Sequence, residues 1–340
     1  MTHGNNYQNR RVFLKSVAVL AAGTVMAPAL RVLPAEAGTI LVRTEEQRIL
    51  MGTIVGMSVM APSRLQGEEG IGRAYEEINR LVAILSRFDS GTALSVLNEQ
   101  GRLSGSPQEL LDVLDYSRQM HDSSGGRFDV TIAPVVNLLE RTKGRPDASD
   151  LRNALALVDA GRLSRQGSSL RFGFSGMAAT LDGVAKGYIA DRAAEVLQGA
   201  GIEHFMVDAG GDIRVQGSST GSGSPWRIAI EDPDKQGHYP AVIAMRSGAV
   251  ATSGGYEVFF DPQKKSHHLV NPETGASPTY VKSVSVQAPT VMQADGLATA
   301  LSLMHPREAL HLTNSLSGHA CLLVTSTGAR LASDNWGVVL

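Results

Sequence analysis

Two polar residues in the apolar segment 291–304 have the types and spacing needed to hold a cation. Asp295 and Thr299 are four positions apart, so on a helix their side chains lie one above the other on one face. A carboxylate and a hydroxyl make half of the oxygen-only site that Mg2+ prefers, with waters and substrate phosphates supplying the rest. The alternative is structural: Asp295 caps the helix or interacts with its dipole, while Thr299 packs.

A second chemical segment is Thr180-Leu-Asp-Gly-Val-Ala-Lys-Gly-Tyr188, which leads into a predicted helix. Glycines beside a helix start permit close backbone approach and expose N–H groups, which suits a phosphate, and Lys186 adds a positive charge. Glycines at a helix entrance are also common where elements pack tightly, so this segment alone leaves both interpretations standing.

Familiar nucleotide and hydrolase motifs are missing from the sequence or lack the structural context that they require. It contains no Gly-x-x-x-x-Gly-Lys-Ser/Thr phosphate loop, no Gly-x-Gly-x-x-Gly after a predicted strand and no His-Glu-x-x-His. Its one Gly-x-Ser-x-Gly match, Gly217-Ser-Ser-Thr-Gly221, belongs to a Gly/Ser-rich loop between two predicted strands and not to the strand-to-helix turn that a hydrolase nucleophile requires. Nucleotide chemistry in this chain therefore requires another scaffold.

Composition indicates a folded protein with a sizeable core. The chain has 340 residues, 43% of them hydrophobic, and a formal net charge of -2, which favours one large domain or two intimate ones and gives no sign of a nucleic-acid partner. Cys321 is the only cysteine, so no internal disulfide is possible. Its apolar neighbours predict a buried, structural thiol.

The first 37 residues have the pattern of a twin-arginine export signal. Arg10 and Arg11 precede the apolar run 17–30, and Ala35-Glu-Ala37 supplies small residues for cleavage. The alternatives are an amphipathic tail or a membrane anchor, but the run is short for a span. We expect a periplasmic protein with a linker at 38–46 and one domain at 47–340. The signal has no cysteine at its end, so lipid anchoring is not expected.

Hydrophobic periodicity then predicts the elements that position these residues. Helices are expected at 68–88, 106–121 with Ser106 as N-cap, 149–160, from the 180–188 segment to 197, at 291–304 and at 306–316. Strands are expected at 48–60, 170–174, 204–215, 226–230, 241–245, 248–252, 256–260, 283–287, 322–324 and 330–332, and 93–98 is a short helix or an extended piece. Because helices and mostly antiparallel strands are segregated, the pattern predicts an α+β fold.

Eight short motifs in order carry a family resemblance. They are Met51-Gly-Thr53, Ser86-Arg-Phe88, Phe128-Asp-Val-Thr131, Leu181-Asp-Gly-Val-Ala-Lys-Gly-Tyr188, Val207-Asp-Ala-Gly-Gly-Asp212, Thr252-Ser-Gly254, His268-Leu-Val-Asn-Pro-Glu-Thr-Gly275 and Ala294-Asp-Gly-Leu-Ala-Thr299. Together they span residues 47–335 and resemble the ApbE family of periplasmic FAD:protein FMN transferases. The resemblance implies a T-fold-like architecture of antiparallel sheets with packed helices. The export signal and the 180–188 segment look most like the branch that accompanies nitrous-oxide respiration.

The resemblance also implies roles for particular residues. Asp295 and Thr299 match the family's Mg2+ side-chain ligands, and Gly183 matches the position whose backbone carbonyl completes the protein's share. The family usually has an aspartate six residues before the lysine, but here Thr180 stands there and the carboxylate appears as Asp182. The residues expected to contact FAD are Met51, Phe88, Arg127, Phe128, Asp129, Asp182, Lys186 and Leu269.

The reaction implied by the resemblance is transfer of FMN from FAD to a Thr or Ser hydroxyl of another protein, with release of AMP. The expected acceptor is a periplasmic or membrane protein with a Ser/Thr-Gly-Ala-Thr type motif, for example a membrane flavoprotein of a respiratory system. Mg2+ would neutralise the diphosphate, and the acceptor hydroxyl needs a proton acceptor, for which His268, Asp208 and Asp212 are the candidates.

Each proton-acceptor candidate has a structural alternative. His268 could be a strand histidine held by hydrogen bonds, and Asp208 and Asp212 could simply be exposed on a tight turn around Gly210-Gly211. His267 is expected to be solvated.

Two other functions remain beside the transferase. One is a non-catalytic FAD- or FMN-binding assembly factor, and the other is a Mg2+-dependent FAD pyrophosphatase, in which water replaces the acceptor hydroxyl. The Gly183, Asp295 and Thr299 pattern favours catalysis, because a binding module has no need of a cation across the diphosphate.

Overall fold

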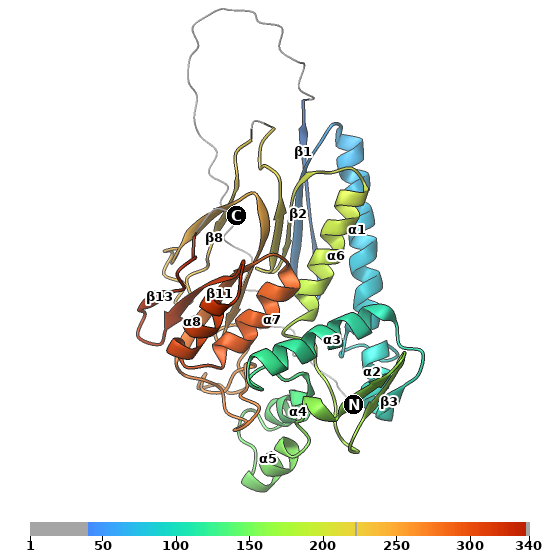
Figure 1. Cartoon of the computed structure of the whole chain (residues 1–340), viewed down its shortest axis with the longest axis vertical. Coiled ribbons are helices and arrows are strands. Elements are labelled where there is room, and N and C mark those ends of the chain that lie inside the picture. Colours follow the sequence, from blue (N-terminus) through green and yellow to red (C-terminus); the bar gives the residue numbers. More distant parts are fainter. Residues whose placement is uncertain (1–39, 222, 338–340) are drawn as a thin grey trace, which may run out of the picture. The chain divides into compact units, whose positions relative to one another are not determined.

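An eight-stranded antiparallel sheet is the framework of the fold (Figure 1). The computed structural model describes residues 40–221 and 223–337, so the predicted export signal lies outside the described residues. The sheet has the order β1 (Val42–Leu50), β2 (Thr53–Ala61), β6 (His204–Ala209), β7 (Ile213–Gln216), β10 (Ser247–Gly254), β11 (Val281–Ala288), β12 (Ala320–Thr325) and β13 (Arg330–Ala332). Every pairing between these strands is antiparallel, which confirms the α+β prediction.

Four helices pack against this sheet. They are α1 (Arg64–Leu85), α6 (Ala185–Gly199), α7 (Val291–Ser302) and α8 (Pro306–Ser315). Figure 1 shows α1 and α6 side by side near β1 and β2, with α7 next to α6 and in front of β11. The helix α1 buries Ile71, Tyr75 and Ile78, and the Ser63 side chain caps its N-terminus.

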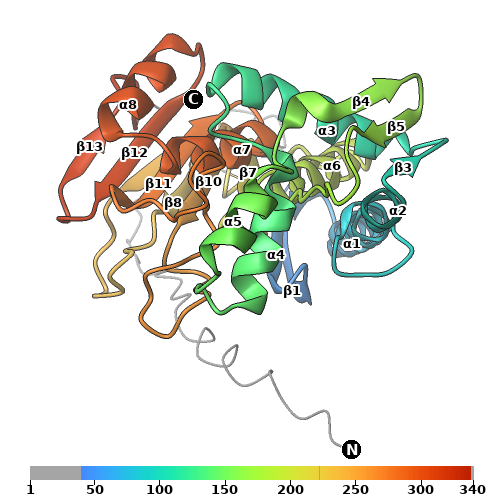
Figure 2. The same cartoon turned by 90° about the horizontal axis from the view of Figure 1, so that it is seen from below.

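A second group of elements lies at the lower end of the fold in Figure 1 and faces the viewer in Figure 2. It consists of α2 (Ala93–Gln100), α3 (Gln108–Ser123), η2 (Val130–Ile132), α4 (Ala133–Arg141), α5 (Ala148–Leu155) and η3 (Ala160–Arg162), with a small sheet of β3 (Arg102–Leu103), β5 (Ser169–Phe172) and β4 (Leu163–Gln166). A two-stranded sheet of β8 (Trp226–Ala229) and β9 (Val242–Met245) completes the fold.

Strand alternation gives the large sheet a core on each face. On β11, Val284 and Val286 belong to the main core, which also contains residues of α1, α6 and α7. On β10, Val250 instead belongs to a second core that includes Trp226 of β8. The face of β10 and β11 that meets α7 is therefore the one that positions the predicted site.

Several predicted boundaries are wrong. The expected linker at 38–46 overlaps β1, because a hairpin that turns at Met51-Gly52 pairs residues 42–50 with 53–61. The predicted strand 204–215 is likewise a hairpin, β6 and β7, that turns at Gly210-Gly211. Alternation alone does not distinguish two paired arms from one long strand.

At the level of elements, two further predictions fail and one helix was missed. Residues 256–260 form no strand, and only an isolated bridge links Phe259 to His267. The helix α4 was not predicted, and Pro107, with no side-chain cap, takes the N-cap place expected for Ser106. Of the two alternatives at 93–98, the helix is correct.

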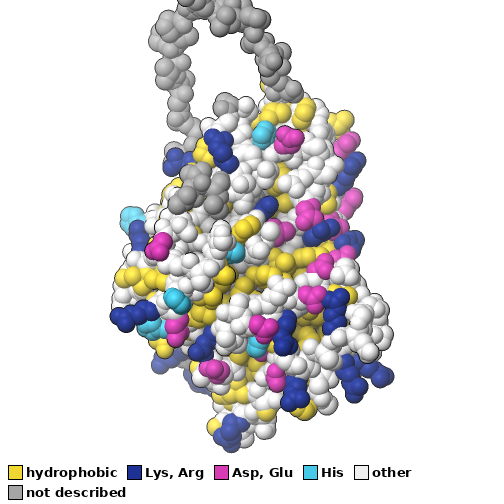
Figure 3. All heavy atoms as spheres, in the orientation of Figure 1, with side chains coloured by type: hydrophobic (Ala, Val, Ile, Leu, Met, Phe, Trp, Pro, Cys, Tyr) yellow, Lys and Arg dark blue, Asp and Glu magenta, His cyan; other side chains and the backbone are white. Residues whose placement is uncertain are grey.

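The described surface carries charges of both signs. On the face seen in Figure 3, acidic and basic side chains are interspersed and apolar bands run between them, which agrees with the small net charge. Cys321 is fully buried as predicted. Within residues 40–221 and 223–337, no helix has the length and apolar character needed to cross a bilayer.

Candidate functional site

The helix α7 presents Asp295 and Thr299 toward α6. Its N-cap is Thr290, whose side chain accepts a hydrogen bond from the Gln293 N–H. Asp295 is the fifth residue of α7, so the alternative that it caps the helix is wrong. The Asp295 carboxylate instead accepts the Gly187 N–H of α6 at 3.0 Å, and the side chain is 4% exposed.

Thr299 lies one turn further along α7 and meets the turn that precedes α6. Its hydroxyl is 3.4 Å from the Gly183 carbonyl oxygen and 3.3 Å from the Ser253 hydroxyl. A Cβ added at Gly183 would lie 2.9 Å from the Thr299 hydroxyl, so only glycine allows this approach without a shift of the threonine. Gly183, Ser253 and Thr299, which are far apart in the sequence, are thus neighbours in the fold.

The oxygens of this cluster fit a Mg2+ ion. Adjacent ligand oxygens of octahedral Mg2+ lie about 3 Å apart, close to the separation of the Thr299 hydroxyl from the Gly183 carbonyl. Among the described residues, only the Gly187 N–H donates to the Asp295 carboxylate, which leaves its other oxygen without a protein donor. The described residues contain no group of three His, Cys, Asp or Glu side chains arranged for a metal, so the rest of the shell would be waters and phosphates.

Charge around Asp295 is balanced by one lysine. Burial raises the pKa of Asp295 well above its usual value, and the nearby Asp212 raises it further, while Lys186 and the Gly187 N–H act in the opposite direction. The Lys186 ammonium lies 2.8 Å from the Asp212 carboxylate. Burial opposes its charge, but Asp212, Asp295 and Glu257 together hold the pKa of Lys186 above its ordinary value. A positive charge therefore persists beside the oxygen cluster.

Sequence reasoning missed two residues near this cluster. Ser253 lies on the same face of β10 as Ala249 and Ala251, which places it under α7; strand alternation could have found it. Glu257 interacts electrostatically with Lys186 and Asp212, although its residue is exposed at the surface. No local pattern marks Glu257, because it belongs to an irregular loop.

Asp208 and Asp212 are at either end of the β6–β7 turn. The Asp208 carboxylate accepts the Gly211 N–H at 2.7 Å, and burial raises its pKa, with a further increase from Asp212. A Cβ at Gly210 would lie 2.3 Å from the Thr53 hydroxyl, and both turn glycines have positive φ. The prediction of two exposed carboxylates is wrong for Asp212, which is 2% exposed.

The two adjacent histidines differ in environment. The His268 Nδ1 lies 3.4 Å from the Val258 carbonyl, and burial lowers the pKa of His268 to about 4. The ring is therefore neutral near pH 7, as a proton acceptor must be. The expectation of a solvated His267 is wrong: this ring is 8% exposed, and its Nε2 lies 3.2 Å from the Pro278 carbonyl.

Phe88 presents an exposed aromatic ring on the loop after α1. It is 74% exposed, and the Arg87 guanidinium stacks over it at 4.3 Å from the ring centre. The same guanidinium donates to the Asp182 carboxylate at 2.8 Å. The Arg87 guanidinium thus contacts both Asp182 and Phe88, and the predicted contact of these two residues with FAD stays a prediction.

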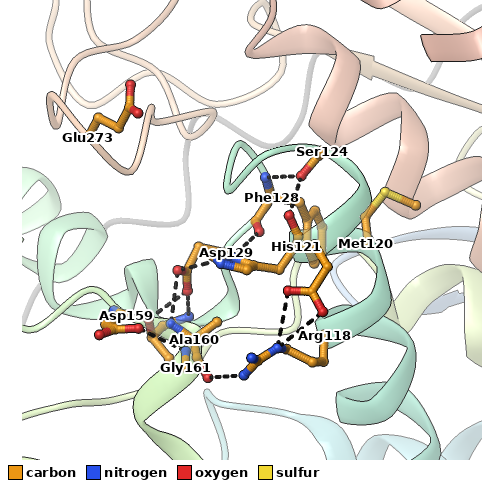
Figure 4. Close-up of polar contacts among 12 residues, drawn as sticks. Arg118, Met120, His121, Ser124, Phe128, Asp129, Asp159, Ala160, Gly161 and Glu273 are labelled. Carbon is orange, nitrogen blue, oxygen red and sulfur yellow. Dashed lines mark hydrogen bonds and ion pairs between the residues drawn. The ribbon is translucent and has the colours of Figure 1, made fainter.

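The run Arg127-Phe128-Asp129 is mostly occupied with internal contacts. Figure 4 shows the Asp129 carboxylate directed at the η3 turn, where it accepts the Ala160 N–H at 3.1 Å. It also accepts the Thr131 N–H and hydroxyl at 2.7 and 2.6 Å. Phe128 is 4% exposed in the main core, and Arg127 forms an ion pair with Glu273 at 2.6 Å. Of the three, Arg127 has the most accessible side chain for a ligand.

The last two predicted FAD contacts lie on different parts of the fold. Met51 occupies the β1–β2 turn with φ of 52° and is partly buried. Leu269 is 6% exposed and follows His268 directly. No ligand contact is tested for either residue, so both remain predictions.

Comparisons with known proteins converge on one family. The sequence profile described as "ApbE family" matches residues 51–323. A protein of Vibrio cholerae named FAD:protein FMN transferase is 34% identical over 248 residues, which cover 69% of this chain and 72% of that protein. A Haemophilus influenzae protein of the same name is 30% identical over 261 residues, covering 71% of this chain and 75% of its own.

A solved structure gives the same result at the level of fold. The structure titled flavin transferase ApbE from Vibrio cholerae superposes with a TM-score of 0.74 at 29% identity. The match covers 87% of this chain and 98% of that one. The architecture described above is therefore similar to that of a solved flavin transferase over nearly its whole described length.

Proposed function

The chain belongs to the ApbE family, and on that premise we propose that it transfers the FMN part of FAD to a hydroxyl of an acceptor protein in a Mg2+-dependent reaction that releases AMP. The observation that carries the proposal is the meeting of the Gly183 carbonyl, Asp295 and Thr299 beside Lys186. This is a set of hard oxygen ligands next to a persistent positive charge, which suits a metal-bound diphosphate.

The Gly183 carbonyl, the Asp295 carboxylate and the Thr299 hydroxyl would hold Mg2+. When bound, the ion supplies neutralisation of the diphosphate oxygens as charge develops on them. Lys186 contributes a second positive charge at the same place, and Asp212 keeps its ammonium oriented through their 2.8 Å ion pair. The protein thereby offsets the repulsion between the diphosphate and the incoming oxygen.

In the proposed transfer, the acceptor oxygen forms a bond to the FMN phosphorus. The bond between that phosphorus and the oxygen shared with AMP breaks, and AMP leaves with the bonding electrons. The hydroxyl proton passes to a protein base, for which His268 is best suited because burial keeps its ring neutral. With Nδ1 directed at the Val258 carbonyl, Nε2 is the atom that would receive the proton.

Three parts of the proposal concern partners and location. The acceptor carries a Ser/Thr-Gly-Ala-Thr type motif and is a periplasmic or membrane protein, such as a respiratory flavoprotein. The chain reaches the periplasm by the twin-arginine route, on the basis of Arg10 and Arg11 and the apolar run after them. The resemblance to the nitrous-oxide branch supports a respiratory acceptor.

The test combines purified protein, FAD, Mg2+ and an acceptor with the motif, and follows flavin fluorescence on the acceptor in denaturing gels together with AMP and free FMN. Covalent fluorescence with stoichiometric AMP supports a transferase. AMP with free FMN and no labelled acceptor indicates a pyrophosphatase, and no product with retained FAD indicates a binding protein.

A variant assigns the activity to the proposed metal residues. Asp295→Asn keeps the side-chain shape but removes the charge, so transfer should be lost while FAD binding and the melting temperature are retained. Asp334→Asn, at an exposed residue near the C-terminus, is the matched control and should behave as the parent protein. Full transfer by Asp295→Asn would refute the metal assignment.

A further inference from the structure

The helices α6 and α7 meet through contacts that repeat every four residues. From one contact to the next, the residue number rises by four along α6 and falls by four along α7. The Gly183 carbonyl meets Thr299, and the Gly187 N–H meets Asp295. Each contact joins a backbone group near α6 to a side chain of α7. These are the contacts that assemble the proposed metal site.

A third contact continues the series but reverses its chemistry. Asp191, one turn beyond Gly187, accepts the Val291 N–H and the Met292 N–H at 2.9 Å each. Val291 lies one turn before Asp295, so the spacing of four holds on both helices. Here a side chain of α6 binds the backbone of α7, and that side chain is 13% exposed.

We propose that Asp191 is a positioning residue for the metal site: by binding the first two N–H groups of α7, it sets where that helix places Asp295 and Thr299 relative to the Gly183 carbonyl. This inference rests on the proposed function, because the site that it positions is the proposed Mg2+ site. Asp191 itself lies beyond reach of the cluster, on the next turn of α6.

The bonding at the start of α7 supports a specific role for this carboxylate. A helix N-terminus leaves its first N–H groups without intrahelical partners, and a carboxylate there gains both hydrogen bonds and a favourable dipole interaction. Thr290 serves only the Gln293 N–H, and Asp191 supplies the partner for the Val291 and Met292 N–H groups. The cap therefore comes from a different helix, which ties the position of α7 to α6.

Two neighbouring features make the link between the helices stiff. A Cβ at Gly187 would lie 2.6 Å from the Val291 carbonyl oxygen, so the two backbones are already in close contact at this turn. Arg214 of β7 lies 4.0 Å from the Asp191 carboxylate, and its guanidinium also donates to the Pro289 carbonyl just before α7. A displacement at Asp191 would therefore be carried along α7 to Asp295 as a rigid movement.

The experiment measures metal affinity directly, with Mn2+ as a paramagnetic substitute for Mg2+ and FAD present without acceptor. Asp191→Asn can accept one N–H but presents its own amide to the other, so Mn2+ should bind about 10- to 100-fold more weakly. Asp112→Asn is the matched control: Asp112 lines the same surface cleft as Asp191 but contacts Tyr188 and not α7. It should change the Mn2+ affinity by less than about twofold.

A catalytic readout separates positioning from a general structural loss. If Asp191 acts through metal placement, Asp191→Asn should regain most of the parent kcat at saturating Mg2+, with the KM for FAD little changed. Hydrogen exchange should be faster at the Val291 and Met292 amides. An Asp191→Asn protein with parental Mn2+ affinity overturns the inference.

The Asp295→Asn protein keeps this result distinct from the larger proposal. If the parent protein and Asp295→Asn bind Mn2+ equally, the proposed metal site fails whatever Asp191 does. If Asp295→Asn alone loses Mn2+ while Asp191→Asn does not, the metal site stands and the positioning inference fails.

A second variant covers the case in which Asp191→Asn does not fold. Val291→Pro removes one of the two N–H donors and keeps the carboxylate. Proline is favoured at the first helical position, and Thr290 already has the extended φ of -129° and ψ of 158° that a residue before proline prefers. A weaker Mn2+ affinity in Val291→Pro supports the inference, and an unchanged affinity contradicts it.

Discussion

Replacement of Gly187 by alanine tests whether the close approach of α6 and α7 builds the site. The added Cβ would lie 2.6 Å from the Val291 carbonyl oxygen and 2.7 and 2.8 Å from the Met292 Cα and N. All three atoms are backbone, so no side-chain rotation relieves the overlap. Ordinary van der Waals contact requires the helices to separate locally by roughly 0.8 Å.

The expected effect on stability is small because two contributions oppose each other. Overpacking of this kind costs about 1–3 kcal/mol, while replacing glycine by alanine in a helix recovers about 0.5–1 kcal/mol. The net loss is on the order of 1 kcal/mol, which for a domain of this size lowers Tm by roughly 2 °C.

The expected effect on activity is much larger. Gly187 donates its N–H to Asp295, so the separation displaces a proposed metal ligand by most of an ångström. A misplacement of about 1 Å can reduce a rate on the order of 100-fold. The predicted signature is therefore a large loss of flavin transfer with nearly parental stability.

The assay compares transfer rates from flavin fluorescence on the acceptor with melting curves of the same preparations. Gly72→Ala in α1 is the matched control, because a Cβ at Gly72 meets no atom within 4 Å; it should keep full activity and gain up to about 1 kcal/mol. Gly187→Ala with parental rate and parental or higher Tm would refute the reasoning.

Four further predictions concern the hydroxyl ligand, the pH dependence of activity, the pH dependence of stability, and export. Thr299→Ser keeps the hydroxyl and should retain most activity, whereas Thr299→Val should need at least about 10-fold more Mg2+ for half-maximal transfer; equal Mg2+ dependence in the two proteins would exclude a ligand role. Because burial lowers the pKa of His268 to about 4, kcat/KM measured at saturating Mg2+, which keeps Asp295 ionised, should be constant from pH 8 to about 5.5 and fall only as Nε2 becomes protonated; half-loss near pH 6.5 under these conditions would contradict this assignment. In the unfolded chain His268 takes up a proton near its ordinary pKa of about 6.5, whereas in the folded protein it does so only near pH 4. The free energy of unfolding should therefore decrease as the pH falls from about 6.5 to about 4, and it should decrease less in His268→Asn. Urea titrations of both proteins at several pH values measure this difference. Replacing Arg10 and Arg11 by lysine should keep the protein in the cytoplasm on cell fractionation, and undiminished periplasmic protein would remove the export assignment.

Short-range patterns in the sequence determined the parts of the protein that depend on neighbours along the chain. The spacing of four between Asp295 and Thr299 predicted, before any fold was known, that a carboxylate and a hydroxyl share one face of a helix. Periodicity also predicted α1, α7, α8 and most strands, since burial of one face imposes a local repeat. The α+β class followed from the order of these elements.

Only the tertiary structure decided which residues meet across the fold. Asp191 contacts Val291 and Ser253 contacts Thr299 although 100 and 46 positions separate them. Likewise, the carboxylate of Asp129, expected to contact FAD, turned out to bind the η3 turn through Ala160. No periodic pattern contains such pairings, because they arise when helices and strands pack and each buried polar group must find a partner. Local sequence therefore specified the chemical groups of the site, and packing specified their distances.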